Sequence, residues 1–228
     1  TESIELNVGL VSITFTNMAI NAIKDSFVYF LSNVASTSFN ALSTIMIGIY
    51  ITPTEVAYWG VCIQIIGTIQ ACYSPIGDGI YPEMIKNQNL NLIKKIIKIF
   101  LPIIIIGCVC AYFLADVGLM ILGGAEYLNA VPVFRILIPS LLFGFLAIIL
   151  GWPTLGAIGK SKQVTMSTII GISTNIILLI CLIITKKFTL INVAIIRDIT
   201  EFIFFAVRFY FFNKYKYLFR KDLAKEGE

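Results

Sequence analysis

A chain of 228 residues in which 58% are apolar and only 13% are charged is far more hydrophobic than a soluble domain, where charged residues reach about 25%. A water-soluble fold of this length could not bury so much apolar surface, so the composition favours a protein embedded in a bilayer. The net charge of +4 does not indicate nucleic-acid binding, because the Lys and Arg residues lie between the apolar runs and there set membrane topology.

Residues 1–24 do not fit a membrane span, and we expect a cytoplasmic connector at the membrane interface. Apolar and polar residues alternate from Ile4 to Leu10 as in a short strand, and Thr16 or Asn17 could cap a short amphipathic helix. The chain does not begin with methionine and shows no basic segment followed by a cleavage site, so no signal peptide is predicted. We expect it to be part of a longer protein.

Six apolar runs predict an all-α membrane protein with about six transmembrane helices over residues 25–213. Each run is close to the roughly 20 residues that cross a bilayer. The runs cover residues 26–51, 55–82, 99–114, 131–158, 163–185 and 188–212. The third would reach residue 122 if its helix continued through Asp116. Residues 214–228 form a basic tail.

The Lys and Arg residues between the runs predict the orientation. Twelve of them fall in loops or tails on one side of the predicted bundle, and three fall on the other side. Cytoplasmic loops carry the excess of Lys and Arg. The twelve therefore mark the cytoplasmic side, and both ends of the chain are expected there.

The first predicted span carries a polar stripe. Its polar residues recur at spacings of three, four and seven, which places them on one side of a helix: Ser26, Asn33, Ser36, Thr37, Asn40 and Thr44. Small polar residues bond neighbouring helices in many bundles, and they can equally line a water-filled cavity. The two asparagines, Asn33 and Asn40, favour the cavity.

The second and fifth spans add further polar candidates. Gln64 and Asp78 share a face of the second span with small residues, and Pro75 is expected to kink this helix. A carboxylate within a membrane is a functional candidate by default, although a place at the interface explains Asp78 equally well. Asn175 gives the fifth span a modest polar face, and Gln70 on the second span is a further candidate.

The sixth span is the most informative, because it carries charges within an apolar and aromatic run. Arg197, Glu201 and Arg208 are separated by four and seven residues and share a helix face, with Asp198 beside them. Arg197 can pair with Glu201. An unpaired charge at mid-membrane costs at least about 2.5–3.5 kcal/mol, so this face points into protein or water. It is either a structural ion pair or the charged wall of a transport pathway.

Enzyme chemistry finds little support in the sequence. No histidine is present, and the motifs of zinc proteases, serine hydrolases, P-loop enzymes and dinucleotide-binding enzymes are absent. Five cysteines fall inside apolar runs, and even the close pair Cys108 and Cys110 has no second pair near it. We interpret the cysteines as packing residues and predict no catalytic residue, metal or cofactor.

Several short segments, spread over nearly the whole chain, carry a resemblance to one family. They are Asp25-Ser26-Phe27, Leu31-Ser32-Asn33, Ile47-Gly48-Ile49, Thr54-Glu55-Val56-Ala57-Tyr58, Gln70 with Ser74-Pro75-Ile76, Ile80-Tyr81-Pro82, Gly124 with Glu126-Tyr127, Arg135-Ile136-Leu137 and Gly159-Lys160-Ser161-Lys162. In this order they resemble the second half of the polysaccharide flippases, the O-antigen (Wzx-type) transporters of the multidrug/oligosaccharidyl-lipid/polysaccharide exporter superfamily.

The resemblance implies a transporter with two lobes of six helices around a central cavity, of which this chain would be the C-terminal lobe. It implies flipping of an undecaprenyl-pyrophosphate-linked oligosaccharide, an O-antigen or other surface polysaccharide repeat unit, across the bacterial cytoplasmic membrane. The implied partners are this lipid-linked substrate, the bilayer, an N-terminal lobe missing from this chain and, as a further candidate, a polysaccharide polymerase.

Two positions depart from the family pattern. Relatives often carry basic residues where the second span has Gln64 and Gly67, and Arg where Glu83 follows the Tyr-Pro pair. A cationic cavity for pyrophosphate is therefore less evident here. Arg197 and Arg208 could supply positive charge instead.

The leading hypothesis is a lipid-linked oligosaccharide flippase that works by alternating access. In it the stripe on the first span faces glycan hydroxyls, while Arg197 attracts the diphosphate and Glu201 orients Arg197. One alternative is a multidrug or ion-coupled antiporter of the same superfamily, with Asp78, Asp198 or Glu201 as a proton or sodium site. The other is a non-transporting membrane subunit of a glycan-synthesis complex, with its charged face buried against a partner helix.

Overall fold

The computed structural model describes residues 44–219 and the single positions 23, 27, 30, 34, 37 and 41. Helices joined by short connections make up this part of the chain, and none of its residues lies in a strand. The predicted all-α class is confirmed. The strand-like segment of the connector, Asn33, Asn40 and the tail beyond residue 219 lie outside the described residues.

Four stretches of the described chain are long and apolar enough to cross a membrane: Pro53–Asn87, Leu90–Phe113, Pro139–Gly156 and Ser161–Ile184. They correspond to the second, third, fourth and fifth predicted spans. The sixth predicted span forms a single helix of 26 residues, Leu190–Tyr215. It differs from the other four stretches in carrying several charged residues within its apolar run. Half of the residues of the first predicted span lie outside the described residues.

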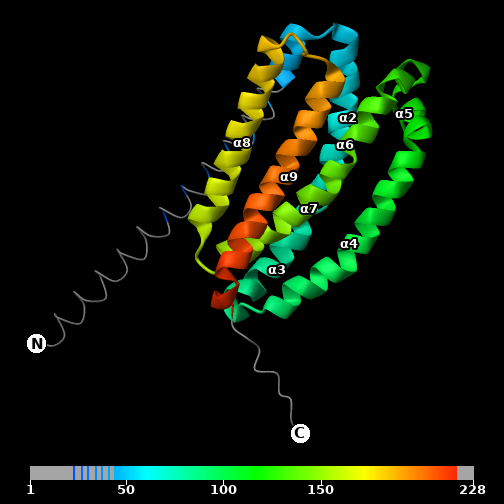
Figure 1. Ribbon diagram of the computed structural model, residues 1–228. Coiled ribbons are helices and arrows are strands. Elements are labelled where there is room, and N and C mark those ends of the chain that lie inside the picture. Colours follow the sequence, from blue (N-terminus) through cyan, green and yellow to red (C-terminus); the bar gives the residue numbers. More distant parts are fainter. Residues whose placement is uncertain are drawn as a thin grey trace, which may run out of the picture.

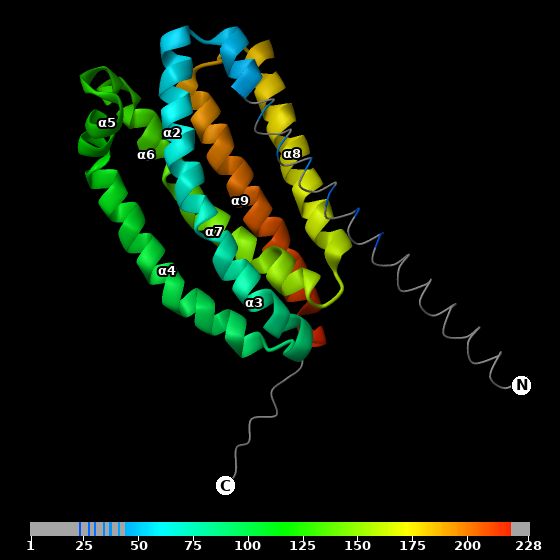
Figure 2. The ribbon, with the colours of Figure 1, turned by 180° about the vertical axis from the view of Figure 1, so that it is seen from behind.

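The helices run up and down between the two ends of one bundle (Figures 1 and 2). In chain order they are α2 (Pro53–Ala71), α3 (Ser74–Asn87), α4 (Leu90–Phe113), α5 (Ala115–Gly123), the 3-10 helix η1 (Ala125–Ala130), α6 (Val131–Leu137), α7 (Pro139–Leu150), the π-helical turn η2 (Gly151–Gly156), α8 (Ser161–Ile184), α9 (Leu190–Tyr215) and the 3-10 turn η3 (Lys216–Leu218). Residues 44–50 are also helical. α2 with α3, α4 with α5, and α6 with α7 each make one crossing.

Side-chain caps fix where two of the crossings begin. The Thr52 hydroxyl accepts a hydrogen bond from the Glu55 N–H at 3.4 Å and donates to the Glu55 carboxylate at 2.8 Å, while Pro53 occupies the first turn of α2. This reciprocal capping explains why the Thr-Pro-Thr segment separates the first two spans. Asn89 caps α4 in a similar way, by accepting from the Asn91 N–H at 2.8 Å.

The long predicted spans are interrupted where the sequence indicated breaks. α2 ends at Ala71, and α3 restarts with Pro75 in its first turn, so the second span is two helices rather than one kinked helix. α4 ends just before Asp116, and α5 carries the chain on to Gly123. The long helix of the third crossing therefore ends near Asp116, and a second, shorter helix continues the crossing beyond it.

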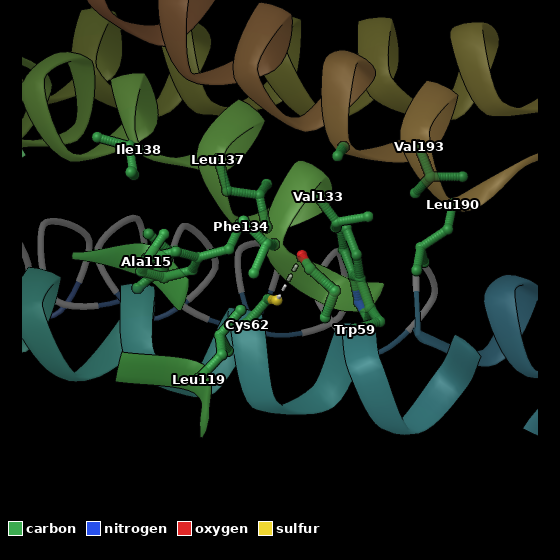
Figure 3. Close-up of a cluster of buried hydrophobic side chains, with 14 of the residues drawn as sticks. Trp59, Cys62, Ala115, Leu119, Val133, Phe134, Leu137, Ile138, Leu190 and Val193 are labelled. Atoms are coloured by element: carbon green, nitrogen blue, oxygen red, sulfur yellow. Dashed lines mark hydrogen bonds between the residues drawn. The ribbon is translucent and has the colours of Figure 1, made fainter. Parts of the chain in front are cut away.

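Two apolar cores lie at opposite ends of the bundle. One gathers α2, α5, α6 and the start of α9 around side chains such as Trp59 and Leu137, which are 3% and 0% exposed (Figure 3). The other brings Met84 of α3, Phe145 of α7 and Phe219 beyond η3 together. Between them α9 packs along α6, α7 and α8, so the charged residues of α9 face these helices.

The positive charges are segregated as the predicted loops require. Eight described lysines lie at the end of the bundle where α3 ends, α8 begins and α9 ends (Figures 1 and 2): Lys86, Lys94, Lys95, Lys98, Lys160, Lys162, Lys214 and Lys216. Arg135, Lys186 and Lys187 lie toward the other end. The assignment of the lysine-rich end to the cytoplasm stays a prediction.

Candidate functional site

Two of the charged side chains on α9 form an ion pair inside the bundle. Arg197 Nη2 lies 3.1 Å from Glu201 Oε1, and the two side chains are only 13% and 12% exposed. The pairing follows from their four-residue spacing on one helix. Because each charge is largely withdrawn from solvent, removal of either partner would weaken the charge compensation of the other in a region of low dielectric constant.

The fourth crossing is broken in its middle. Pro139 has no backbone N–H, and α6 ends at Leu137 before α7 begins. Gln70 of α2 reaches this break and donates from Nε2 to the Ser140 carbonyl at 3.3 Å. A Cβ atom at Gly144 would lie 2.7 Å from Gln70 Nε2. Glycine at this position therefore gives the Gln70 side chain the space it needs.

Asp198 faces the same break from α9. Its carboxylate lies near the backbone N–H of Ser140, at the start of α7. The first turn of a helix carries partial positive charge and unpaired N–H groups, so a carboxylate there stabilises the helix. Its Oδ1 atom is buried and has no hydrogen-bond partner among the described residues. Asp198 is thus a candidate cap of a half-helix, and its Oδ1 is an unused acceptor among the described residues.

Arg208 joins α9 to two neighbouring helices. Its Nη1 donates to the Ala147 carbonyl of α7 at 2.7 Å. On α8, Nε donates to Ser167 Oγ at 3.0 Å, and Nη2 donates to Thr168 Oγ1 at 3.2 Å. Three hydrogen bonds in different directions fit the planar fork of donors that distinguishes Arg from Lys.

The end of α7, just before the π-helical turn η2, makes a backbone carbonyl available to Arg208. At the end of α7 the Gly151 N–H turns to the Ile148 carbonyl instead of continuing the α-helical pattern to Ala147. The Ala147 carbonyl then accepts from Arg208. A Cβ atom at Gly151 would lie 3.0 Å from Arg208 Nη1, so glycine lets the guanidinium approach the helix. π-helical turns often mark functional or strained positions.

A polar contact and a close approach hold α8 against α9. Asn175 is 2% exposed, and its Nδ2 donates to Thr200 Oγ1 at 3.0 Å. Its Oδ1 atom has no hydrogen-bond partner among the described residues. One turn toward the lysine-rich end, a Cβ at Gly171 would lie 2.5 Å from the Phe204 ring. Asn175 therefore contributes to helix packing.

A different set of polar residues remains uncovered on the second crossing. The predicted polar face of α2 and α3 is exposed along its length, at Gly60, Gln64, Gly67, Thr68, Ala71 and Asp78. The Thr68 hydroxyl donates a hydrogen bond to the Gln64 carbonyl at 2.7 Å. Gln70 points away from this face, toward Ser140. The exposed polar residues thus lie on α2 and α3, whose ribbons Figure 2 shows from behind, whereas Arg197 and Glu201 of α9 are largely buried.

The structure brings some of the predicted site residues together and separates others. Gln70 and Asp198 meet at one residue, Ser140, and Arg197 pairs with Glu201 beside them on α9. The exposed side chains of the second crossing lie outside this group. The role of the predicted residues in a substrate pathway stays a prediction.

Sequence reasoning missed the partners of these side chains. Ser140, Ser167 and Gly151 each contact a predicted residue, yet small residues in apolar runs give no distinctive signal. Pro139 and the Gly151-Trp-Pro segment were the available clues, because both interrupt a helix in the middle of an apolar run. Half-helices of this kind mark binding sites in many transporters.

Within residues 44–219, no group of three Cys, Asp or Glu side chains is placed to hold a metal ion. The arrangement offers hydrogen-bond donors, acceptors and one enclosed ion pair, which suit binding and conformational change. No protein-family model, curated protein or solved structure matches the chain.

Proposed function

We propose that this chain is one lobe of a membrane transporter that flips a lipid-linked oligosaccharide across the cytoplasmic membrane of a bacterium. The observation that carries the proposal is the exposed polar face of α2 and α3, on a crossing that otherwise reads as a membrane span. The family resemblance of the sequence supplies the substrate class. A second lobe, on the N-terminal side of the same protein, completes the transporter.

The exposed polar face of α2 and α3 must contact something other than lipid. Gln64, Thr68 and Asp78 are exposed on the described chain, and acyl chains cannot satisfy an amide or a carboxylate. Water in a passage between two lobes satisfies both groups. The same groups can bond the hydroxyls of a sugar headgroup while the polyprenyl tail stays in lipid. Rocking of one lobe against the other then exposes the passage to each side in turn.

Of the two arginines on α9, Arg197 is the one that we propose contacts the diphosphate of the substrate. Arg208 is occupied by three hydrogen bonds to α7 and α8, which favours a structural role. Arg197 is held by Glu201 and is 13% exposed. In this proposal the diphosphate competes with Glu201 for the Arg197 guanidinium, and the ion pair closes again when substrate leaves.

The test removes polar groups from the exposed face without changing its shape greatly. In the complete protein, Gln64→Leu combined with Thr68→Val should lower surface polysaccharide about tenfold or more, because two sugar-contacting groups are lost. A matched control is Thr185→Val, since Thr185 is also exposed and also bonds back to a carbonyl one turn earlier, that of Cys181, at 2.8 Å. Protein amount in the membrane is measured for each variant. Normal polysaccharide in the double variant would refute the proposal.

An ion-coupled antiporter is the second candidate, and one observation favours it. Asp198 Oδ1 is buried without a hydrogen-bond partner among the described residues, and Glu201 lies one turn further along the same helix. Two carboxylates inside a membrane can carry a proton or a sodium ion. Proton or sodium flux into liposomes that is lost on Asp198→Asn, with polysaccharide export unaffected, would favour this candidate.

A further inference from the structure

One end of the bundle carries a large uncompensated positive charge. The eight lysines at the ends of α3 and α9 and the starts of α4 and α8 form no ion pair within residues 44–219, where the two ion pairs are Arg135 with Asp116 and Arg197 with Glu201. Glu83, the described carboxylate nearest to this end in sequence, is hydrogen-bonded to Asn87. Glu83 keeps its negative charge, but the eight lysines outnumber it, so the described part of this end has a net positive charge that can attract an external anion.

Two of these lysines converge on one aromatic ring. Lys160 Nζ lies 4.7 Å from the centroid of the Tyr215 ring, and Lys214 Nζ lies 5.8 Å from the same centroid. Lys160 precedes α8, and Lys214 lies in the last turn of α9. The start of α8 and the end of α9 thus meet at one place, which we call the Tyr215 corner: Lys160, Lys214 and Tyr215.

The Tyr215 corner has the composition of a lipid-headgroup site. Each exposed cation–π contact contributes only about 0.5–1 kcal/mol, which does not remove the repulsion between two ammonium groups near one ring. An anion such as a phosphate near both ammonium groups would offset their charge. One turn deeper along α9, Phe211 stacks on Tyr215 with a centroid separation of 6.5 Å, so an apolar wall lies below the charged groups. Charge above and aromatic surface below match the interface of a bilayer.

We propose that the Tyr215 corner binds the headgroup of an anionic phospholipid of the surrounding bilayer. This assignment requires that α8 and α9 cross the membrane, and it does not depend on the transported substrate. A bilayer lipid fits better than the transported headgroup, because the corner lies on α8 and α9 whereas the exposed polar face lies on α2 and α3. Bound lipid would tie the end of α9 to the start of α8.

The test measures lipid binding to the protein in detergent by native mass spectrometry. Phosphatidylglycerol should bind more tightly than phosphatidylcholine. A lysine near an anionic surface contributes enough that each removal should weaken phosphatidylglycerol binding about fivefold. Lys160→Gln with Lys214→Gln should then weaken it on the order of 25-fold, and Lys160→Arg with Lys214→Arg should keep it. The matched control is Lys186→Gln with Lys187→Gln, which changes the same charge at the opposite end.

The outcomes separate the alternatives. Equal binding of phosphatidylcholine and phosphatidylglycerol, or equal losses in the corner and control variants, would overturn the site. Preferential binding of undecaprenyl phosphate at the same lysines would overturn the choice of a bilayer phospholipid. Normal polysaccharide export by the corner variants would leave the site intact, because lipid binding is measured directly. A monodisperse elution profile for each variant shows that the fold is retained.

Discussion

At the scale of single residues, the charged side chains of α9 divide by what they touch. Arg208 bonds a backbone carbonyl of α7 and two hydroxyls of α8, so all three of its nitrogens are used within the chain. Arg197 is held by a carboxylate on its own helix. A side chain that bonds three groups on two helices fixes their packing, whereas the ion pair of Arg197 with Glu201 joins two residues of one helix.

Replacement of Arg208 should therefore lower stability more than replacement of a surface arginine. Arg208→Met keeps the length of the side chain but leaves the Ala147 carbonyl without its charged donor, at a cost on the order of 3 kcal/mol. Thermal unfolding in detergent, followed by loss of the monodisperse peak, measures the change. Arg208→Lys should recover only part of it, since an ammonium cannot reproduce the fork of donors.

Arg135→Met is the matched control for this measurement. Arg135 has an ion pair with Asp116 at 2.7 Å, but its side chain is 33% exposed and that of Asp116 is 54% exposed. Exposed pairs contribute roughly 0–1 kcal/mol. Equal destabilisation by Arg208→Met and Arg135→Met would contradict a packing role for Arg208.

At the scale of helices, α8 and α9 approach most closely where a glycine meets an aromatic ring. Gly171→Ala would place a methyl group 2.5 Å from the Phe204 ring, which forces the ring or the helices to shift at a cost of about 1–3 kcal/mol. Gly107→Ala is the control, because a Cβ at Gly107 of α4 meets nothing within 4 Å and alanine favours a helix. We expect Gly171→Ala to lower the unfolding temperature and Gly107→Ala to leave it unchanged or raise it. The opposite order would refute the close approach.

The broken fourth crossing makes a second prediction about helices. Asp198 faces the first N–H of α7 at Ser140, and asparagine is as good a cap as aspartate. Asp198→Asn should therefore cost less than about 1 kcal/mol of stability, whereas Asp198→Leu should cost about 2 kcal/mol or more, because it leaves a buried N–H unsatisfied. Unfolding temperatures of the two variants check this order. Similar unfolding temperatures would argue that Asp198 does not cap α7.

At the scale of the whole molecule, the sequence predicts the crossings better than it predicts their contacts. Apolar runs, prolines and lysine-rich loops predict the all-α class, about six spans and the grouping of charges at two ends, and the described residues contain four candidate spans. These features are local, so a single sequence records them. The contact between Gln70 and Ser140 joins residues 70 positions apart. It depends on how helices pack, and small residues such as Ser140 and Gly151 leave no pattern to read.

Because α9 carries charged residues, whether this helix crosses the membrane is a separate question. Its 26 residues are long enough, and its charged residues contact α7 within the bundle or pair on α9 itself, so burial in protein can offset the cost of crossing. We then expect the ends of α8 and α9 to alternate between the two sides, with the lysine-rich side in the cytoplasm.

Fusions of green fluorescent protein, which fluoresces in the cytoplasm but not after export in unfolded form, can map this topology. We expect fluorescence for fusions after Lys162 and after Lys216, and none for a fusion after Lys187, because α8 and α9 each reverse the side. Alkaline phosphatase fusions at the same positions serve as the control and should give the reverse pattern. Fluorescence at Lys187 but not at Lys162 would invert the orientation. The same signal after Lys187 and Lys216 would mean that α9 does not cross, and the transporter would then lose its sixth helix.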